Sequence, residues 1–204
     1  IRIQDLSSSL AGDAAGIKEG DFVLDVCGAP GGKGLHAADL LHGTGQVEIR
    51  DVSDYKVSLI KENIARSGCT NVSACVWNAC EFDASMEQKA DVVIADLPCS
   101  GLGIIGRKPD IKYNASMDGI RDLAALQRQM LSVVWQYVKP GGVLVYSTCT
   151  VNRLENDENR ARFLNEYPFE PVDISGRLGI DFQDDSLKEG YIQFYPGVHP
   201  CDGF

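Results

Sequence analysis

The chain has 204 residues, of which 44% are hydrophobic and 24% charged, as expected for a globular α/β domain with a sizeable core. Its net charge of −10 and its pI near 4.7 argue against strong nucleic-acid binding by this chain alone, although an RNA substrate stays open. No apolar run reaches the ~20 residues of a membrane span and no signal peptide opens the chain, so we expect a cytoplasmic protein without membrane contact.

The cysteines indicate a reducing environment. Seven occur, an odd number, without regular spacing and without a Cys-x-x-Cys pair, and this favours reduced thiols over disulfides. Cys75 and Cys80 are too loosely spaced for a zinc site, and His199 with Cys201 could ligate a metal, although an ordinary loop is favoured. We therefore expect no metal.

The predicted elements alternate between strand and helix along most of the chain. Apolar runs predict five buried strands, at residues 22–27, 46–52, 71–77, 91–97 and 142–148. Amphipathic spacing predicts helices at 34–42, 54–67 and 118–138. This alternation is typical of an α/β fold with a doubly wound, mostly parallel, Rossmann-like sheet.

Smaller features complete this organisation. Asp54 is expected to be the N-cap of the second helix. The turn residues KPGG (139–142) come directly before the fifth strand, and YIQFYPG (191–197) predicts an antiparallel strand at the sheet edge. Because no linker or repeat interrupts the chain, we predict a single domain over residues 1–204 and a monomer.

The segment DVCGAPGGKG (25–34) joins the first strand to a helix, where this class of sheet binds ligands. It fails the phosphate-loop pattern, because only three residues separate Gly28 from Gly32 and a glycine follows Lys33. It also fails the G-x-G-x-x-G dinucleotide fingerprint. A glycine-rich turn after the acid Asp25 suits S-adenosylmethionine, whose positive groups favour carboxylates and which carries no phosphate. A plain strand-to-helix turn stays the alternative.

Asp51 ends the second strand, roughly 20 residues beyond the glycine loop. An acid at this place accepts hydrogen bonds from the diol of a ribose. It supports a nucleoside-containing cofactor, without distinguishing a nicotinamide dinucleotide from S-adenosylmethionine.

Two cysteines follow predicted strands. Asp96 and Cys99 end the fourth strand in ADLPCSGLG (95–103), and Cys149 ends the fifth. Neighbouring strands lie ~5 Å apart, so if these two strands are adjacent, both thiols face one pocket. Four other cysteines are interpreted as small buried hydrophobic residues: Cys27, Cys69, Cys75 and Cys80.

A thiol, a carboxylic acid and a methyl donor together suit methylation of carbon-5 of cytosine. This carbon is a poor nucleophile until a thiolate adds to carbon-6 while an acid supplies a proton at N3. Carbon-5 then attacks the methyl group, loses its proton, and the thiol is eliminated. Asp96 suits the acid, and of Cys99 and Cys149 one would attack while the other assists release. The base must also leave any stack.

Other functions stay open at this point. Amino-methylating enzymes carry an Asp/Asn-Pro-Pro-aromatic motif where this chain has Asp-Leu-Pro-Cys, and such a transferase on the same fold is one alternative. A catalytically inactive RNA-binding module is another. A nicotinamide dehydrogenase has least support, because the glycine spacing fails and no histidine suits hydride transfer.

Five motifs in order resemble those of the RNA cytosine-5 methyltransferases of the Sun/Fmu type: LDVCGAPGGK, DLPCSGLG..GRKPDIKY, LAALQRQML, KPGGVLVYSTCT and ENDEN. The resemblance covers nearly the whole chain. It implies that S-adenosylmethionine is the cofactor, that Cys149 is the nucleophile and that Cys99 promotes release. The residues implied to contact the cofactor are Cys27, Gly28, Ala29, Pro30, Gly31, Gly32, Lys33, Asp51 and Asp96.

The chain departs from the family pattern at two positions. Gly34 stands where the family has Thr, and we expect the missing hydroxyl to loosen the loop. Asn78 stands where an Asp usually holds the adenine side of the cofactor, and an amide still forms one hydrogen bond there.

The two ends of the chain resemble the bacterial small-subunit ribosomal RNA branch, through IQDLSSSL (3–10) and HPCDGF (199–204). This branch implies a ribosomal RNA substrate, 16S rRNA, and an N-terminal helical RNA-binding domain. The chain begins at Ile1 without such a domain, so we interpret it as a piece of a longer protein.

Three further segments bear on the site: a basic loop, an acidic run and the small residues around Cys149. The loop with Arg107, Lys108 and Lys112 is either a solvated turn or a phosphate clamp. The acidic run Glu155–Glu158 is interpreted as the start of a helix, outside the site. Small residues around the fifth-strand cysteine are expected to leave room for a flat base: Ser147, Thr148 and Thr150.

Overall fold

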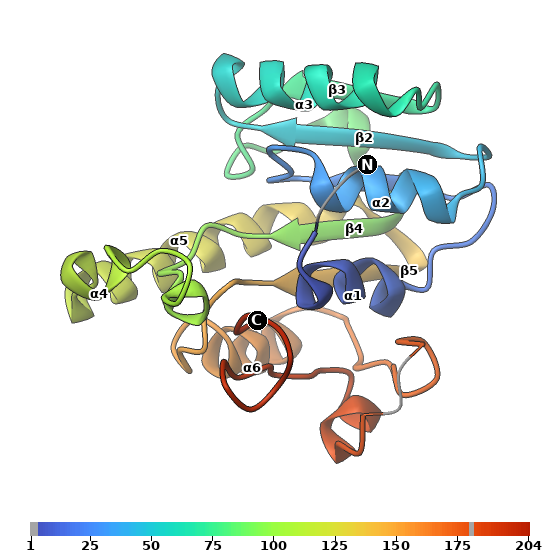
Figure 1. The fold of residues 1–204 in the computed structure, drawn as a ribbon. Helices are drawn as coiled ribbons and strands as arrows, with labels where there is room; N and C mark the ends of the chain where they lie inside the picture. Colours follow the sequence, from blue (N-terminus) through green and yellow to red (C-terminus); the bar gives the residue numbers. More distant parts are fainter. Residues whose placement is uncertain (1–3, 180–181) are drawn as a thin grey trace. The chain divides into compact units, whose positions relative to one another are not determined.

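The structure is a computed structural model that describes residues 4–179 and 182–204 (Figure 1). Ile3, the first residue of the IQDLSSSL segment, lies outside the described residues. The chain divides into two compact units. The sheet unit comprises Ala15–Leu97 and Gln129–Tyr146. The thiol unit comprises residues 4–14, 98–128, 147–179 and 182–204. That residues 1–204 form one functional domain stays a prediction.

The sheet has five strands in the order β3-β2-β1-β4-β5. The pairs β1–β2, β1–β4 and β2–β3 are parallel. This confirms the predicted α/β class, all five predicted strands, and the adjacency of the fourth and fifth. Their bounds are β1 (Phe22–Asp25), β2 (Gln46–Asp51), β3 (Val72–Val76), β4 (Ala90–Asp96) and β5 (Val138–Ser147).

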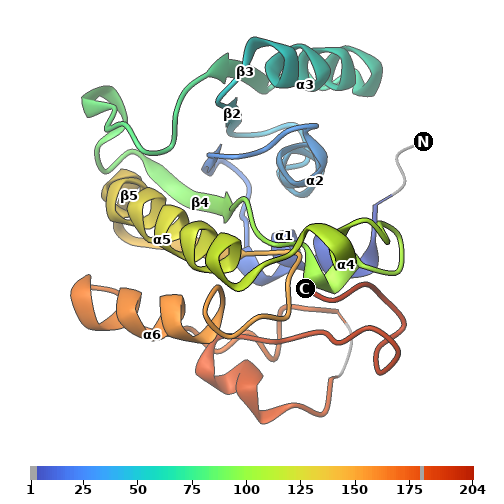
Figure 2. The ribbon, with the colours of Figure 1, turned by 90° about the vertical axis from the view of Figure 1, so that its left-hand side faces the viewer.

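The central strands β1 and β4 form because their apolar runs are buried on both faces, whereas β3 is only partly buried. In β4, the run from Val92 to Ala95 is at most 2% exposed. The helices α2 (Gly32–Leu40) and α3 (Asp54–Ser67) cover one face, and the end of α5 (Met117–Val134) lies on the other (Figure 2). The core between the sheet and α2 and α3 contains mostly branched residues: Val23, Leu35, Leu41, Val47, Ile49, Val57, Ile60, Val92 and Ile94.

The helix ends show two differences from the sequence prediction. The N-cap of α3 is Ser53, whose side chain accepts a hydrogen bond from the Lys56 N–H, so the prediction of Asp54 as the cap was wrong by one residue. Asp54 lies in the first turn, where an acid favours the helix dipole. The predicted helix 118–138 ends as α5 at Val134 and continues as a 3₁₀ turn over Trp135–Tyr137.

The KPGG segment belongs to β5, which begins at Val138, and does not precede the strand as a turn. Gly141 has φ 79°, a left-handed conformation that glycine adopts without strain. A Cβ on Gly142 would lie 2.8 Å from the carbonyl oxygen of Asp91 in β4. The two glycines therefore allow the backbone to bend and pass close to β4.

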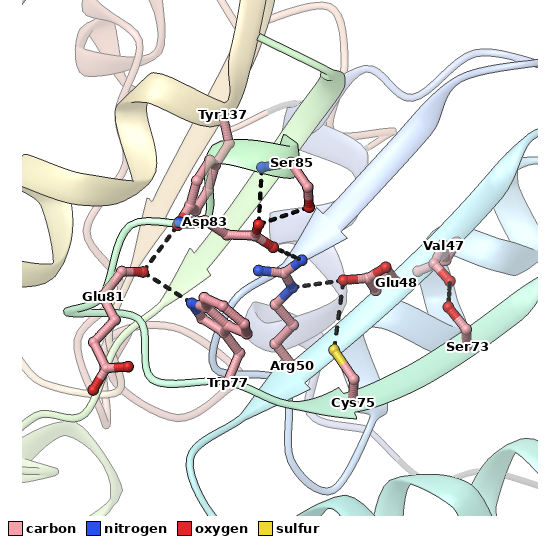
Figure 3. Close-up of polar contacts among 10 residues, drawn as sticks. All are labelled: Val47, Glu48, Arg50, Ser73, Cys75, Trp77, Glu81, Asp83, Ser85 and Tyr137. Carbon is pink, nitrogen blue, oxygen red and sulfur yellow. Dashed lines mark hydrogen bonds and ion pairs between the residues drawn. The ribbon is translucent and has the colours of Figure 1, made fainter. Parts of the chain in front are cut away.

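Arg50 ties the β2 strand to the segment after β3 (Figure 3). This residue is only 3% exposed. Its Nε donates to Glu48 at 2.6 Å and its Nη2 to Asp83 at 2.8 Å. Its guanidinium carbon lies 5.2 Å from the centroid of the Trp77 ring. Two charged hydrogen bonds and an aromatic face stabilise the buried cation, although its Nη1 is buried without a hydrogen-bond partner among the described residues.

The thiol unit contains short elements around a small apolar cluster. This cluster consists of Leu10, Ile174, Leu178, Leu187 and Phe194. The helices are α1 (Leu6–Ala15), which ends in the sheet unit, α4 (Ile111–Asn114) and α6 (Asp157–Glu166), with 3₁₀ turns at Leu102–Ile104 and Asp185–Glu189. A further 3₁₀ turn, Ala84–Met86, lies in the sheet unit. Among the described residues, no helix is both long and apolar enough to cross a bilayer.

The predicted antiparallel edge strand at residues 191–197 is wrong. The described part of the chain has no sheet strand there, and only one isolated bridge joins Pro196 to His199. Instead, Phe194 exchanges two backbone hydrogen bonds with Phe204, at 2.9 and 3.3 Å. Its side chain is 1% exposed in the apolar cluster of the thiol unit. The apolar pattern therefore reflects burial in that cluster and not pairing with the sheet.

Candidate active site

Parallel pairing places three predicted site segments at one edge of the sheet. Asp25, at the end of β1, is in register with Ile49 of β2 and Ile94 of β4. Asp51 and Asp96 each lie two residues beyond these partners. The two carboxylates therefore flank the glycine loop that follows β1, as the sequence predicted.

The glycine loop is fixed by backbone hydrogen bonds. The Gly28 N–H donates to the Arg50 carbonyl at 2.8 Å, and the Leu35 N–H donates to the Gly31 carbonyl at 2.9 Å, at the start of α2. The Asn63 side chain donates to the Pro30 carbonyl at 2.7 Å. A Cβ on Gly28 would lie 2.3 Å from the Ile49 side chain and 2.6 Å from the Asp25 carboxylate. Only glycine therefore fits at position 28.

Asp25 lies beneath this loop and not on its ligand side. It is fully buried, and burial together with the negative charge of Asp96 raises its pKa to about 7. The Lys33 ammonium opposes this effect. The expectation that Asp25 meets the positive groups of a ligand is therefore wrong, because no face of its carboxyl group is accessible.

Asp51 joins the loop to the start of α3. One carboxylate oxygen accepts a hydrogen bond from the Ala29 N–H at 3.1 Å. The other accepts from the Val52 N–H at 2.8 Å and lies 3.1 Å from the Lys56 ammonium. The oxygen that accepts from Ala29 keeps a lone pair for a further donor such as a ribose hydroxyl.

Lys33 and Asp96 form an ion pair with an N···O distance of 2.7 Å. The Lys33 side chain is 10% exposed and that of Asp96 is 31% exposed, so the carboxylate is the accessible partner. Cys27, in the same loop, has a raised pKa, because it is buried and because Asp25 is close. It therefore stays a neutral thiol, although the residue has intermediate exposure, so its interpretation as a small buried residue is confirmed only in part.

Two departures from the family pattern have structural explanations. A Cβ on Gly34 would lie 2.5 Å from the Ile49 side chain, so Ile49 fills the space that a threonine there would need. Asn78 follows β3, one strand further from the loop. Its oxygen accepts from the Cys80 N–H, and its amide donates to Glu81, both at 3.1 Å. Asn78 thus holds a local turn, and its contact with a cofactor stays a prediction.

These residues fit S-adenosylmethionine by their chemistry. Two carboxylates flank the loop, and its one lysine is already paired with one of them. This surplus of negative charge suits a sulfonium and an ammonium group, and it opposes the phosphates of a dinucleotide. Asp51 and Asp96 are the side chains that would hold the ligand.

In the thiol unit, Cys99 and Cys149 lie side by side, with their sulfur atoms 3.3 Å apart. Hydrogen bonding with Cys149, followed by burial, raises the pKa of Cys99. The Gly103 N–H donates to the Cys149 carbonyl at 3.0 Å, and the Gly203 N–H donates to the Gly103 carbonyl at 2.9 Å. The loop after Cys99 and the end of the chain thus support the Cys149 backbone.

The hydroxyl residues around Cys149 are occupied by hydrogen bonds. Thr148 donates to the Asn156 side chain at 2.6 Å, and the Thr150 hydroxyl lies 2.8 Å from that of Ser100. Thr148 is 3% exposed and Thr150 is fully buried. That these small side chains leave room for a base stays a prediction. Their hydroxyls hold the loop together.

Glu155 was missed as a functional candidate. The helix α6 begins at Asp157, and Asp157 and Glu158 lie in its first turn, so that part of the acidic run was interpreted correctly. Glu155 precedes the helix, is fully buried, and accepts hydrogen bonds from Ser100 and Gln127. Local sequence gives no signal for this, because an acid next to a helix start is usually exposed.

Arg107 joins the two terminal motifs through ion pairs. Its guanidinium pairs with Asp5 at 2.5 Å and with Asp202 at 2.8 Å. Both carboxylates belong to the thiol unit, and they come from the two segments that resemble the ribosomal RNA branch. These ion pairs favour a structural role of Arg107 over a phosphate clamp.

Within the described residues, no group of His, Cys, Asp and Glu side chains is arranged to hold a metal.

The chain is similar to known ribosomal RNA methyltransferases. The family described as "16S rRNA methyltransferase RsmB/F" matches residues 15–204. The "Probable ribosomal RNA small subunit methyltransferase B" of Bacillus subtilis is 41% identical over the whole chain, which covers 46% of that protein.

Two solved structures are also similar. PH0851 has a TM-score of 0.89 at 31% identity over 99% of this chain and 45% of its own. NSun6 from Pyrococcus horikoshii, solved with SFG, has a TM-score of 0.79 at 29% identity over 98% of this chain and 50% of its own. The chain thus spans about half the length of the relatives it matches.

Proposed function

Because the chain belongs to the 16S rRNA methyltransferase RsmB/F family, we propose that it transfers a methyl group from S-adenosylmethionine to carbon-5 of a cytosine in small-subunit ribosomal RNA. The observation that carries the proposal is the pair of thiols, Cys99 and Cys149, 3.3 Å apart. Transfer to an amino group or a hydroxyl needs no thiol, whereas carbon-5 becomes nucleophilic only after a thiolate has added to carbon-6.

Cys149 is the proposed nucleophile. Its sulfur forms a bond to carbon-6 of the cytosine ring, and carbon-5 gains the electron density to attack an electrophile. S-adenosylmethionine, when bound, supplies the methyl group as that electrophile. Loss of the proton from carbon-5 then expels the sulfur and restores the aromatic ring.

Cys99 is the proposed assistant of release. Its raised pKa keeps it protonated near neutral pH, so its thiol can donate a hydrogen bond to the sulfur beside it. Such a donor stabilises the thiolate of Cys149, both before it attacks and as it leaves carbon-6.

Asp96 is the proposed acid at N3 of the base. Its side chain is partly accessible, and one of its carboxylate oxygens lies 2.7 Å from the Lys33 nitrogen. The glycine loop and Asp51 are proposed to hold the cofactor, with Asn78 on its adenine side.

The net charge of −10 implies that this chain neutralises few phosphates by itself. We therefore propose that a further RNA-binding segment of the natural protein supplies most of the affinity for RNA, as its relatives are about twice as long. A monomeric enzyme is part of the same proposal.

Trapping on RNA that contains 5-fluorocytosine tests the mechanism. Fluorine on carbon-5 cannot leave as a proton, so the adduct with carbon-6 should persist. We expect a stable crosslink with wild-type protein and cofactor, its loss in Cys149→Ala, and its retention in Cys99→Ala. No crosslink in the wild type, while it methylates unmodified RNA of the same sequence, would overturn the cysteine mechanism.

Two alternatives are separated by simpler measurements. An amino-methylating transferase would keep its activity in Cys149→Ala. An inactive RNA-binding module would show no heat of S-adenosylmethionine binding in calorimetry, whereas the proposed enzyme binds it.

A further inference from the structure

Glu155 is a fully buried carboxylate in an otherwise solvent-exposed acidic run. Its neighbours along that run, Asp157 and Glu158, are both exposed. We infer that Glu155 is a positioning residue that holds the Cys99 loop against the Cys149 loop. This inference rests on the proposed function, because it assigns Glu155 to the geometry of the two proposed reacting thiols.

The carboxylate binds the residue directly after Cys99 with both of its oxygens. Oε1 accepts from the Ser100 backbone N–H at 2.8 Å, and Oε2 accepts from the Ser100 hydroxyl at 2.5 Å. Two bonds to one residue fix both its position and its orientation. The backbone of Cys99 is therefore held at its C-terminal side.

Ser100 extends the contact to the residue directly after Cys149. Its hydroxyl lies 2.8 Å from the Thr150 hydroxyl. Because the Ser100 hydroxyl gives its single proton to the carboxylate, Thr150 must be the donor in this contact. Glu155, Ser100 and Thr150 thus form a chain of hydrogen bonds from one cysteine loop to the other.

Gln127 holds the other side of Cys99. Its amide nitrogen donates to the Pro98 carbonyl at 2.8 Å and to Glu155 Oε1 at 3.1 Å. The amide oxygen of Gln127 accepts from the Asn159 side chain at 2.8 Å, which fixes the orientation of the amide. Both chain neighbours of Cys99 are therefore held. Glu155 binds Ser100 directly and is joined to Pro98 through Gln127.

A carboxylate is the group that this arrangement requires. Three donors converge on Glu155: the Ser100 N–H, the Ser100 hydroxyl and the Gln127 amide. Only a group without protons accepts all three, and a buried donor without a partner is costly. Removing the carboxylate should release Ser100 and let the two sulfur atoms separate, since their own contact is a weak thiol hydrogen bond.

Oxidative pairing of the thiols measures their separation without RNA or cofactor. Diamide takes up the two thiol hydrogens, is reduced to its hydrazine, and leaves a Cys99–Cys149 disulfide. In the wild type we expect fast formation of this bond, identified by peptide mass spectrometry. In Glu155→Ala the rate should fall about 10-fold or more, because sulfur atoms that have moved apart meet less often.

The matched control is Glu158→Ala, which removes an exposed acid of the same run and should form the disulfide at the wild-type rate.

Glu155→Gln tests the role of the acceptor, because its amide oxygen still accepts from the Ser100 N–H. It should therefore pair within about 10-fold of the wild type. Ser100→Ala removes the link to Thr150 while leaving the carboxylate in place, and it should slow pairing as well. This variant keeps the test decisive if Glu155→Ala does not fold.

Methylation assays connect the geometry to the reaction. A positioning defect predicts kcat lowered about 10- to 100-fold in Glu155→Ala with KM for S-adenosylmethionine unchanged, and partial recovery in Glu155→Gln. Wild-type pairing and wild-type kcat in a folded Glu155→Ala protein would overturn the inference. If pairing depends on Glu155 but the wild type does not methylate cytosine, the proposed function fails while the positioning of the thiols stands.

Discussion

The sulfur atoms of Cys99 and Cys149 lie 3.3 Å apart, although 50 residues separate the two cysteines along the chain. At this distance a negative charge on the Cys149 sulfur opposes loss of the proton from Cys99. Hydrogen bonding to Cys149 is the main cause of the raised pKa of Cys99, ahead of burial. The pKa of Cys99 therefore depends on the thiol beside it.

Cys149→Ala is expected to lower the pKa of Cys99, because the main cause of its elevation is removed while burial remains. Since iodoacetamide reacts with the thiolate, the alkylation of Cys99 should reach half of its plateau rate at a lower pH than in the wild type. This midpoint, followed by mass spectrometry, separates a pKa change from a change in access. Cys69→Ala, in the sheet unit, is the control. An unmoved midpoint in Cys149→Ala would contradict the coupling.

Asp25→Asn is expected to change how stability depends on pH. The pKa of Asp25 is raised from its ordinary 3.8 to about 7, so between these values the folded chain holds a proton that the unfolded chain has lost. The stability that this proton provides is complete below about pH 4 and is lost as the pH rises to about 7. The asparagine variant lacks this loss. Between about pH 4 and pH 7, the free energy of unfolding of the variant minus that of the wild type should therefore rise by on the order of a few kcal/mol.

Urea unfolding at a series of pH values measures this difference. Asp122→Asn removes an exposed carboxylate on α5 and should run parallel to the wild type. A constant offset between Asp25→Asn and the wild type at every pH would show that Asp25 titrates normally.

Arg50→Met is expected to lower the free energy of unfolding by about 3 kcal/mol, because it leaves two largely buried carboxylates without their cation. The side chains of Glu48 and Asp83 are 19% and 13% exposed, so water compensates them only in part. The control is Arg121→Met, whose pair with Asp118 is open to solvent and should contribute less than about 1 kcal/mol. Equal effects of the two substitutions would argue against a stabilising contribution of the Arg50 ion pairs.

Gly103→Ala is expected to lower the free energy of unfolding by about 2 kcal/mol, because the added methyl group has no space. Its Cβ would lie 2.2 Å from the carbonyl oxygen of Gly203 and 2.9 Å from that of Cys149. Both contacts are backbone, which cannot swing away like a side chain. Gly106→Ala is the matched control, since no atom lies within 4 Å of its added Cβ. Thermal unfolding of both variants checks this, and equal melting temperatures would refute the close packing at Gly103.

The sequence by itself determined the order and type of the main elements and the place of the cofactor loop. Apolar runs and helical spacing report short-range preferences that the sheet reinforces, so all five strands and the three predicted helices were found within a few residues. Parallel pairing then made Asp51 and Asp96 flank the loop, because the ends of neighbouring strands meet at one edge. These features need no knowledge of distant contacts.

Only the tertiary structure decided which polar residues are buried and what they hold. Glu155 resembles an exposed helix-start acid, and Asp25 resembles a ligand partner, until burial is seen. Residues 191–197 carry a strand-like pattern, yet Phe194 pairs with Phe204 and enters the cluster of the thiol unit. In each case the deciding partner is distant in the chain or hidden by packing. The local sequence pattern indicates whether a residue is apolar or charged. The fold determines whether that residue is buried and which hydrogen-bond or packing partner it meets.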